Sequence, residues 1–181
     1  MEERIIIAGF GGQGVMTVGK FAASIAMSEG REVTFFPSYG AEVRGGTAHC
    51  QIIVSDEPIS SPVVEKADTL IIMNQLSYDR FRPLLRPGGL LILDSSFAQV
   101  APERETDGAT LVKVPATETA NELGNVRVAN VIMLGAYCAR RGLFNPENVV
   151  AQMMKELSDK KHLQEINLLA FQKGMELAGK G

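Results

Sequence analysis

The chain has 181 residues, a length that suits a single domain spanning residues 1–181. Hydrophobic residues make up 45% of it and the formal net charge is −3, which indicates an ordinary core and argues against nucleic acid as a partner. Apolar runs such as 90–93 are far shorter than the roughly 20 residues that cross a membrane. Because the N-terminus leads directly into a predicted strand, we expect a cytoplasmic protein without a signal peptide or membrane partner.

The first motif along the chain is a glycine-rich turn, residues 9–14, with the sequence Gly-Phe-Gly-Gly-Gln-Gly. It follows the apolar run Arg4–Ala8, a predicted buried strand, and precedes the predicted helix Val15–Glu29. Glycines let a ligand approach the backbone, and the free N–H groups and dipole of a first helical turn favour an anion. The motif therefore predicts a phosphate-binding turn.

A second glycine-rich loop spans residues 38–46. It places Tyr39, Glu42 and Arg44 among glycines, a mixture that is typical of binding loops. Arg44 has two interpretations at this point. It is either a bidentate clamp for an anion or the partner of Glu42 in an ion pair that shapes the loop.

Two predicted strands flank this loop. The first, Glu32–Phe36, should end at Pro37, and the second, Thr47–Ser55, alternates between apolar and polar residues, which predicts a half-exposed strand. The loop is too short for a parallel crossover, which takes a dozen or more residues. We therefore expect the second strand to be antiparallel to the first or to lie at an edge of the sheet.

The rest of the chain alternates between strands and helices. We expect strands at Thr69–Met73, Leu90–Leu93 and Leu111–Val114, and helices at Gln75–Leu85, Thr117–Leu123, Val128–Arg141, from Asn145 onward, and at Leu163–Ala178. The alternation predicts an α/β fold, a three-layer α/β/α domain with a mostly parallel, mixed sheet and a Rossmann-like start. Val128–Arg141 is apolar nearly all round, so it should be a buried helix.

The glycine turn also matches the dinucleotide-binding pattern G-x-G-x-x-G. That pattern needs an acidic residue near the end of the second strand, and residues 35–38 contain none. A series resembling Walker A runs from Gly14 to Lys20, but Phe21 stands where a magnesium-binding Ser or Thr is needed. These departures weigh against NAD and against an NTPase. Lys20 is left either as a side chain that reaches a phosphate at the helix start or as a solvated lysine.

Neither a metal site nor a catalytic constellation is predicted. Cys50 and Cys138 lie far apart, and neither belongs to the clustered spacing that zinc or iron–sulfur sites use. His49 beside Cys50 is the only hint, but adjacent strand residues point to opposite faces. The second histidine, His162, lies in a lysine-rich segment. We therefore expect no catalytic residue on this chain.

The two glycine-rich loops together indicate a family. Residues 9–14, followed by Tyr-Gly-Ala-Glu-Val-Arg-Gly-Gly at 39–46, resemble the gamma subunit of 2-oxoacid:ferredoxin oxidoreductases, the 2-oxoglutarate branch more than the pyruvate branch. Segments 59–62, 67–68 and 130–135 resemble that family in order and spacing. The resemblance covers nearly the whole chain and extends to domain III of the single-chain pyruvate enzymes.

The resemblance implies a subunit of an enzyme that converts a 2-oxoacid to an acyl-CoA and reduces ferredoxin, here 2-oxoglutarate to succinyl-CoA. Thiamine diphosphate and iron–sulfur clusters would lie on the partners, the alpha and beta (thiamine-bearing) and ferredoxin-like subunits, because this chain lacks the motifs for both. For this domain the resemblance implies coenzyme A. In the single-chain enzymes a lysine matches Lys20, whereas Ser-Asp stands where this chain has Gly12 and Gln13.

The expected site combines the glycine turn with polar side chains beside it. The residues expected to hold a phosphate of coenzyme A are Gly11, Gly12, Gln13, Gly14 and Lys20. The residues expected to line the approach or contact the thiamine-bearing subunits are Ser38, Tyr39 and Arg44. Two alternatives remain, a structural subunit that assembles the complex without a ligand and a free-standing NAD-binding oxidoreductase. If the chain is the gamma subunit of such an enzyme, we expect it to be inactive when isolated.

Overall fold

The computed structural model describes residues 1–39, 46–100 and 108–179. Its strands are β1 (Glu2–Phe10), β2 (Glu32–Tyr39), β3 (Thr47–Ser55), β4 (Ala67–Ile72), β5 (Leu85–Asp94) and β6 (Thr110–Val114). Its helices are α1 (Val15–Ser28), α2 (Gln75–Phe81), α3 (Ala116–Glu122), α4 (Ala129–Arg141), α5 (Pro146–Glu156) and α6 (Lys161–Gly179), with the short 3-10 helices η1 (Arg82–Leu84) and η3 (Val126–Val128). The order of elements is the predicted one.

The strands form one sheet in the order β2-β3-β1-β4-β5-β6. β3 pairs antiparallel with both β1 and β2, whereas parallel pairs join β1, β4, β5 and β6. The sheet is therefore mixed and mostly parallel, and the predicted antiparallel pairing of β2 with β3 is confirmed. The prediction that β3 is half exposed was wrong, because both of its faces are covered. α1 packs on the face with Cys50 and Ile52, and Phe81 packs on the face with His49.

β2 lies at an edge of the sheet and continues past its predicted end. It runs through Pro37 to Tyr39, which an edge strand permits because one side of its backbone needs no partner. Since β1 and β2 are both antiparallel to β3, they point the same way. The extension therefore brings Tyr39 to the same end of the sheet as the glycine turn.

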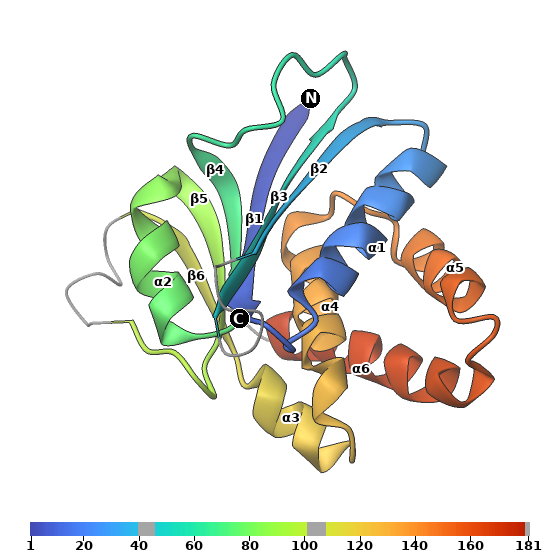
Figure 1. The fold of residues 1–181 in the computed structure, drawn as a ribbon. Helices are drawn as coiled ribbons and strands as arrows, with labels where there is room; N and C mark the ends of the chain where they lie inside the picture. The colour runs from blue at the N-terminus through green and yellow to red at the C-terminus, as the bar shows by residue number, and fades with distance from the viewer. Residues whose placement is uncertain (40–45, 101–107, 180–181) are drawn as a thin grey trace.

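Helices cover both faces of the sheet, but unequally (Figure 1). Residues of α1, α4 and α6 share one core with Ile5 and Ile7 of β1, and residues of α2 share a second core with Ile6. The alternation along β1 places these isoleucines on opposite faces. This arrangement confirms the predicted three-layer α/β/α fold. In the part of the chain that the structure describes, no helix is long and apolar enough to cross a bilayer.

α4 is buried, as predicted, and it packs against α6 at two glycines. A Cβ atom on Gly135 would lie 2.2 Å from the backbone oxygen of Phe171, and one on Gly174 would lie 1.9 Å from that of Ile132. Because the distance between packed helices depends on the side chains at their contact, these glycines allow an unusually close approach. The contact fixes the relative positions of α4 and α6.

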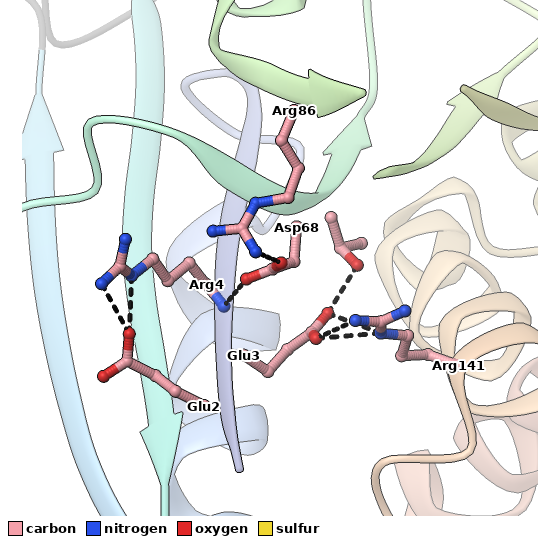
Figure 2. A network of polar contacts seen from close by, with 7 residues as sticks. Glu2, Glu3, Arg4, Asp68, Arg86 and Arg141 are labelled. Carbon is pink, nitrogen blue, oxygen red and sulfur yellow. Dashed lines mark hydrogen bonds and ion pairs between the residues drawn. The ribbon is translucent and has the colours of Figure 1, made fainter. Parts of the chain in front are cut away.

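A network of charged side chains stabilises the end of the sheet opposite the glycine turn (Figure 2). The buried Glu3 carboxylate accepts hydrogen bonds from Nε of Arg141 at 2.9 Å and from Oγ1 of Thr69 at 2.7 Å. Asp68 of β4 pairs with Arg86 of β5. The network therefore joins β1, β4 and β5 to the end of α4, far along β1 from the turn.

Candidate functional site

The glycine turn joins the end of β1 to the start of α1, as predicted. Gly12 and Gly14 have φ values of 103° and 75°, in the left-handed region that favours glycine. A Cβ atom on Gly12 would meet nothing within 4 Å, whereas one on Gly14 would lie 2.2 Å from Nδ2 of Asn130. Gly12 is thus open to its surroundings, while Gly14 is required by the packing of α1 against α4.

The start of α1 keeps unused hydrogen-bond donors. The first hydrogen bond of the helix runs from the N–H of Val18 to the backbone oxygen of Gly14 at 3.0 Å. The N–H groups of residues 14–17 have no acceptor among the described residues, and neither a capping side chain nor an acidic residue lies in the first turn. An anion would satisfy these donors and would be favoured by the helix dipole.

Gln13 shapes the turn through its side-chain amide. Its Oε1 accepts from the N–H of Phe10 at 2.7 Å and from Nδ2 of Asn74 at 3.2 Å, and its Nε2 donates to the backbone oxygen of Met73 at 3.1 Å. These bonds tie the turn to the residues after β4. An amide nitrogen carries two hydrogens, so one remains for a ligand.

The described ends of the second glycine-rich loop lie at this end of the sheet. The N–H of Gly11 donates to the backbone oxygen of Gly46 at 3.0 Å, and Phe10 lies opposite Thr47 in the β1–β3 pair. Tyr39, 68% exposed, lies at the end of β2. Tyr39 and Gly46, near the two ends of the second loop, therefore lie at the same end of the sheet as the glycine turn. Arg44, predicted to belong to the same site, lies outside the described residues.

A cavity of about 690 Å³, here called the cationic cavity, opens between the glycine turn and the helices η3, α4 and α6. Its lining includes Gly12, Gly14, Tyr39, Arg127, Asn130 and Lys160. The guanidinium of Arg127 and the ammonium of Lys160 have no ion-pair partner among the residues that the structure describes. Two positive side chains and the start of α1 thus face one space, which suits a negatively charged ligand.

A smaller hollow of about 380 Å³, here called the apolar hollow, also borders Gly12. Its lining is largely apolar and includes Phe10, Met73, Phe97 and Val126, together with Arg127. Gly12, Phe10 and Arg127 line both spaces. The turn therefore separates a charged compartment from an apolar one.

Two predicted site residues lie outside both spaces. Lys20 is exposed on α1, and Ser38 lies in β2 opposite His49. Neither contributes to the lining of the cationic cavity or of the apolar hollow. Of the predicted set, Gly11, Gly12, Gln13, Gly14 and Tyr39 are the members that line one space or the other.

The structure adds functional candidates that the sequence did not single out. Asn130 is 4% exposed, lines the cationic cavity and donates from Nδ2 to the backbone oxygen of Gly14 at 3.0 Å. Arg127 is placed by η3, whose first turn is capped by the side chain of Asn125 accepting from the N–H of Arg127. The capping asparagine was a readable signal for a short helix here. No sequence pattern indicated the contact of Asn130 with Gly14, because the two residues are 116 positions apart.

His49 and Cys50 point to opposite faces of β3, as predicted. The His49 ring packs against the ring of Phe81 at 4.8 Å, and Cys50 belongs to the core beneath α1. Burial, and then the charge of Arg80, lowers the pKa of His49, which keeps the ring neutral at pH 7. The described residues contain no group of three or more His, Cys, Asp or Glu side chains arranged to hold a metal ion.

Both cysteines are expected to be unreactive in the folded protein. Burial raises the pKa of the Cys50 and Cys138 thiols to about 12, so almost no thiolate exists at pH 8. An aromatic disulfide reagent should therefore release chromophore only after the protein is unfolded in urea, and then from both thiols. Fast labelling of either thiol in the native protein would contradict this expectation.

Comparisons with known proteins agree on one family. The model for Pyruvate ferredoxin/flavodoxin oxidoreductase matches residues 4–177. Ketoisovalerate oxidoreductase subunit VorA of Methanothermobacter marburgensis is 38% identical over 99% of this chain, and 2-oxoglutarate synthase subunit KorC of Methanocaldococcus jannaschii is 34% identical over 98% of it. The chain spans 37% of the length of VorA but 95% of that of KorC.

Solved structures show the same fold. The keto/oxoacid ferredoxin oxidoreductase gamma subunit from Geobacter sulfurreducens has a TM-score of 0.84 and 28% identity, with 99% of each chain covered. The 2-oxoglutarate:ferredoxin oxidoreductase from Magnetococcus marinus, with 2-oxoglutarate, coenzyme A and succinyl-CoA bound, has a TM-score of 0.88 and 27% identity. There the match covers 99% of this chain and 31% of the larger one.

Proposed function

The chain belongs to the pyruvate ferredoxin/flavodoxin oxidoreductase family, and we propose that it is the gamma subunit of a 2-oxoacid:ferredoxin oxidoreductase. The full-length match to KorC favours the conversion of 2-oxoglutarate to succinyl-CoA with reduction of ferredoxin. The 38% identity to VorA makes a branched-chain 2-oxoacid the second candidate. In either case the chain acts as part of a complex.

In this proposal the glycine turn holds a phosphate of coenzyme A. The observation that supports it most is the set of unused N–H donors at the start of α1, beside the open Gly12 and the cationic cavity. A homologous enzyme with bound coenzyme A is consistent with this ligand. Lys20, exposed on the same helix, adds positive charge at longer range, and Ser38 and Tyr39 contact a partner subunit.

The redox chemistry belongs to other chains in this proposal. Thiamine diphosphate and iron–sulfur clusters lie on the alpha, beta and ferredoxin-like subunits. The two cysteines of this chain, Cys50 and Cys138, are both buried in the core that α1 and α4 share, and such positions suit packing more than cluster ligation. This chain contributes binding and positioning of coenzyme A.

The substitution Gly12→Asp tests the role of the turn. A side chain has room at Gly12, but its positive φ adds backbone strain, which the control must match. A carboxylate beside the N–H donors would repel a phosphate. Calorimetric titration of the assembled complex with coenzyme A should show an affinity at least about tenfold weaker, equivalent to about 1.4 kcal/mol. Gly88→Asp is the matched control, because Gly88 also has a positive φ and open surroundings but lies in β5, away from the turn.

Three outcomes distinguish the alternatives. Unchanged affinity in Gly12→Asp would overturn the site. A Gly12→Asp chain that binds coenzyme A normally but no longer assembles, as measured by size-exclusion chromatography, would favour the structural subunit. Fluorescence titration of the isolated chain with NADH tests the free-standing NAD-binding oxidoreductase, and we expect no binding, because β2 ends without the acidic residue that a ribose needs.

A further inference from the structure

We propose that Arg127 directs the two ends of the bound ligand into the two different spaces that border Gly12. In this inference, which rests on the proposed function, Arg127 and Lys160 bind the phosphate-bearing part of coenzyme A in the cationic cavity. The uncharged pantetheine arm lies in the apolar hollow. Arg127 would then be the residue that sets which end of the ligand enters which space.

The position of Arg127 supports this assignment. It lies in η3, directly before α4, and lines both spaces. Its side chain is exposed and, among the described residues, forms no ion pair. A guanidinium can bind a phosphate through two parallel hydrogen bonds, and an unpaired one does so without first breaking another contact. Lys160, at the turn between α5 and α6, adds a second positive charge to the same cavity.

A buried polar atom gives an independent indication of a ligand in the cationic cavity. Because the backbone oxygen of Gly14 can only accept, Nδ2 of Asn130 must be the atom that faces it. The other end of the amide, Oδ1, is buried and has no hydrogen-bond partner in the described part of the chain. Such an oxygen is destabilising unless a donor reaches it. Coenzyme A can supply one from an amino, hydroxyl or amide group.

The apolar hollow suits a chain of alkyl segments and amides. Phe97 and Val126, 57% and 52% exposed, line the hollow, and so does the buried Met73. Large apolar side chains left exposed around a hollow commonly mark a binding site. Asn121 of α3 adds an exposed side-chain amide that could bind the amides of a pantetheine arm. The Thr117 hydroxyl already donates to Asp94, so it can only accept from the ligand.

Two ligands and two variants test the roles of the cationic cavity and the apolar hollow independently. Adenosine 3′,5′-bisphosphate carries phosphates but no pantetheine arm, so in the assembled complex Arg127→Gln should weaken both it and coenzyme A by about tenfold or more. Phe97→Ala should weaken coenzyme A severalfold and leave the bisphosphate unchanged. Lys155→Gln, an exposed lysine of α5 outside both linings, is the matched control and should change neither affinity.

The results also separate this inference from the proposed function. If Gly12→Asp weakens coenzyme A and Arg127→Gln does not, the turn binds the ligand and the role of Arg127 is refuted. If Phe97→Ala disrupts assembly but the remaining complex binds coenzyme A normally, the apolar hollow is a subunit contact and its assignment to the pantetheine arm fails. Weakening of coenzyme A alone in Arg127→Gln would likewise contradict the placement of the phosphates.

Discussion

Replacing Gly174 with alanine is expected to lower the free energy of unfolding by about 3 kcal/mol, because the added methyl group overpacks a backbone contact. Its Cβ atom would lie 1.9 Å from the backbone oxygen of Ile132, closer than nonbonded atoms can come, so α4 and α6 must separate. Alanine is favoured over glycine inside a helix by about 1 kcal/mol, which is too little to offset the clash. Urea denaturation followed by circular dichroism measures the difference.

Gly179→Ala, at the end of the same helix, is the control. A Cβ atom there would meet nothing within 4 Å, so this variant should be as stable as the wild type or slightly more so. Equal stability of the two variants would show that the close contact between α4 and α6 is wrong. Because α4 carries Asn130 and α6 carries Asn167, both of which line the cationic cavity, Gly174→Ala should also weaken coenzyme A binding.

Local patterns were enough to predict most of the fold. The apolar run in β1, the glycine turn and the apolar helix α4 each depend on residues close in sequence, and each was found where expected. Errors arose where a strand's neighbours decide its environment. β3 alternates like a half-exposed strand, yet its polar residues are covered, as when Gln51 Oε1 accepts from the N–H of Val64. Similarly, Pro37 could remain in β2 because β2 is an edge strand.

The candidate site was likewise predicted where it depends on consecutive residues and missed where it depends on tertiary packing. The turn was predicted because strand, glycines and helix start are consecutive. Lys20 was chosen by its distance along the chain from Gly14 and by the resemblance, and neither shows which face of α1 borders the cationic cavity. Arg127 and Lys160 could not be chosen at all, because they reach the turn only through the packing of α4, α5 and α6. Site residues that are far apart in sequence can be identified only from the tertiary structure.

The buried ion pair between Glu3 and Arg141 is expected to respond asymmetrically to mutation (Figure 2). The Glu3 side chain is 3% exposed, whereas that of Arg141 is 39% exposed. Removing the arginine leaves a buried carboxylate whose remaining hydrogen bond comes from Thr69, which should cost about 3 kcal/mol of unfolding free energy. Removing the carboxylate leaves a guanidinium that water can reach, so the loss should be only about 1 kcal/mol.

Urea denaturation of Arg141→Met, Glu3→Gln and the double variant at pH 7 tests this expectation. Arg141→Met should be the least stable, because it leaves the buried Glu3 carboxylate without its charged partner. Methionine keeps the apolar part of the arginine side chain, so the lost packing is small. In the double variant no charge is left buried, so it should be more stable than Arg141→Met alone, and the cycle should give a coupling energy of about 2 kcal/mol. If Glu3→Gln proved as destabilising as Arg141→Met, an unpaired buried carboxylate could not be the main cause of the loss in Arg141→Met.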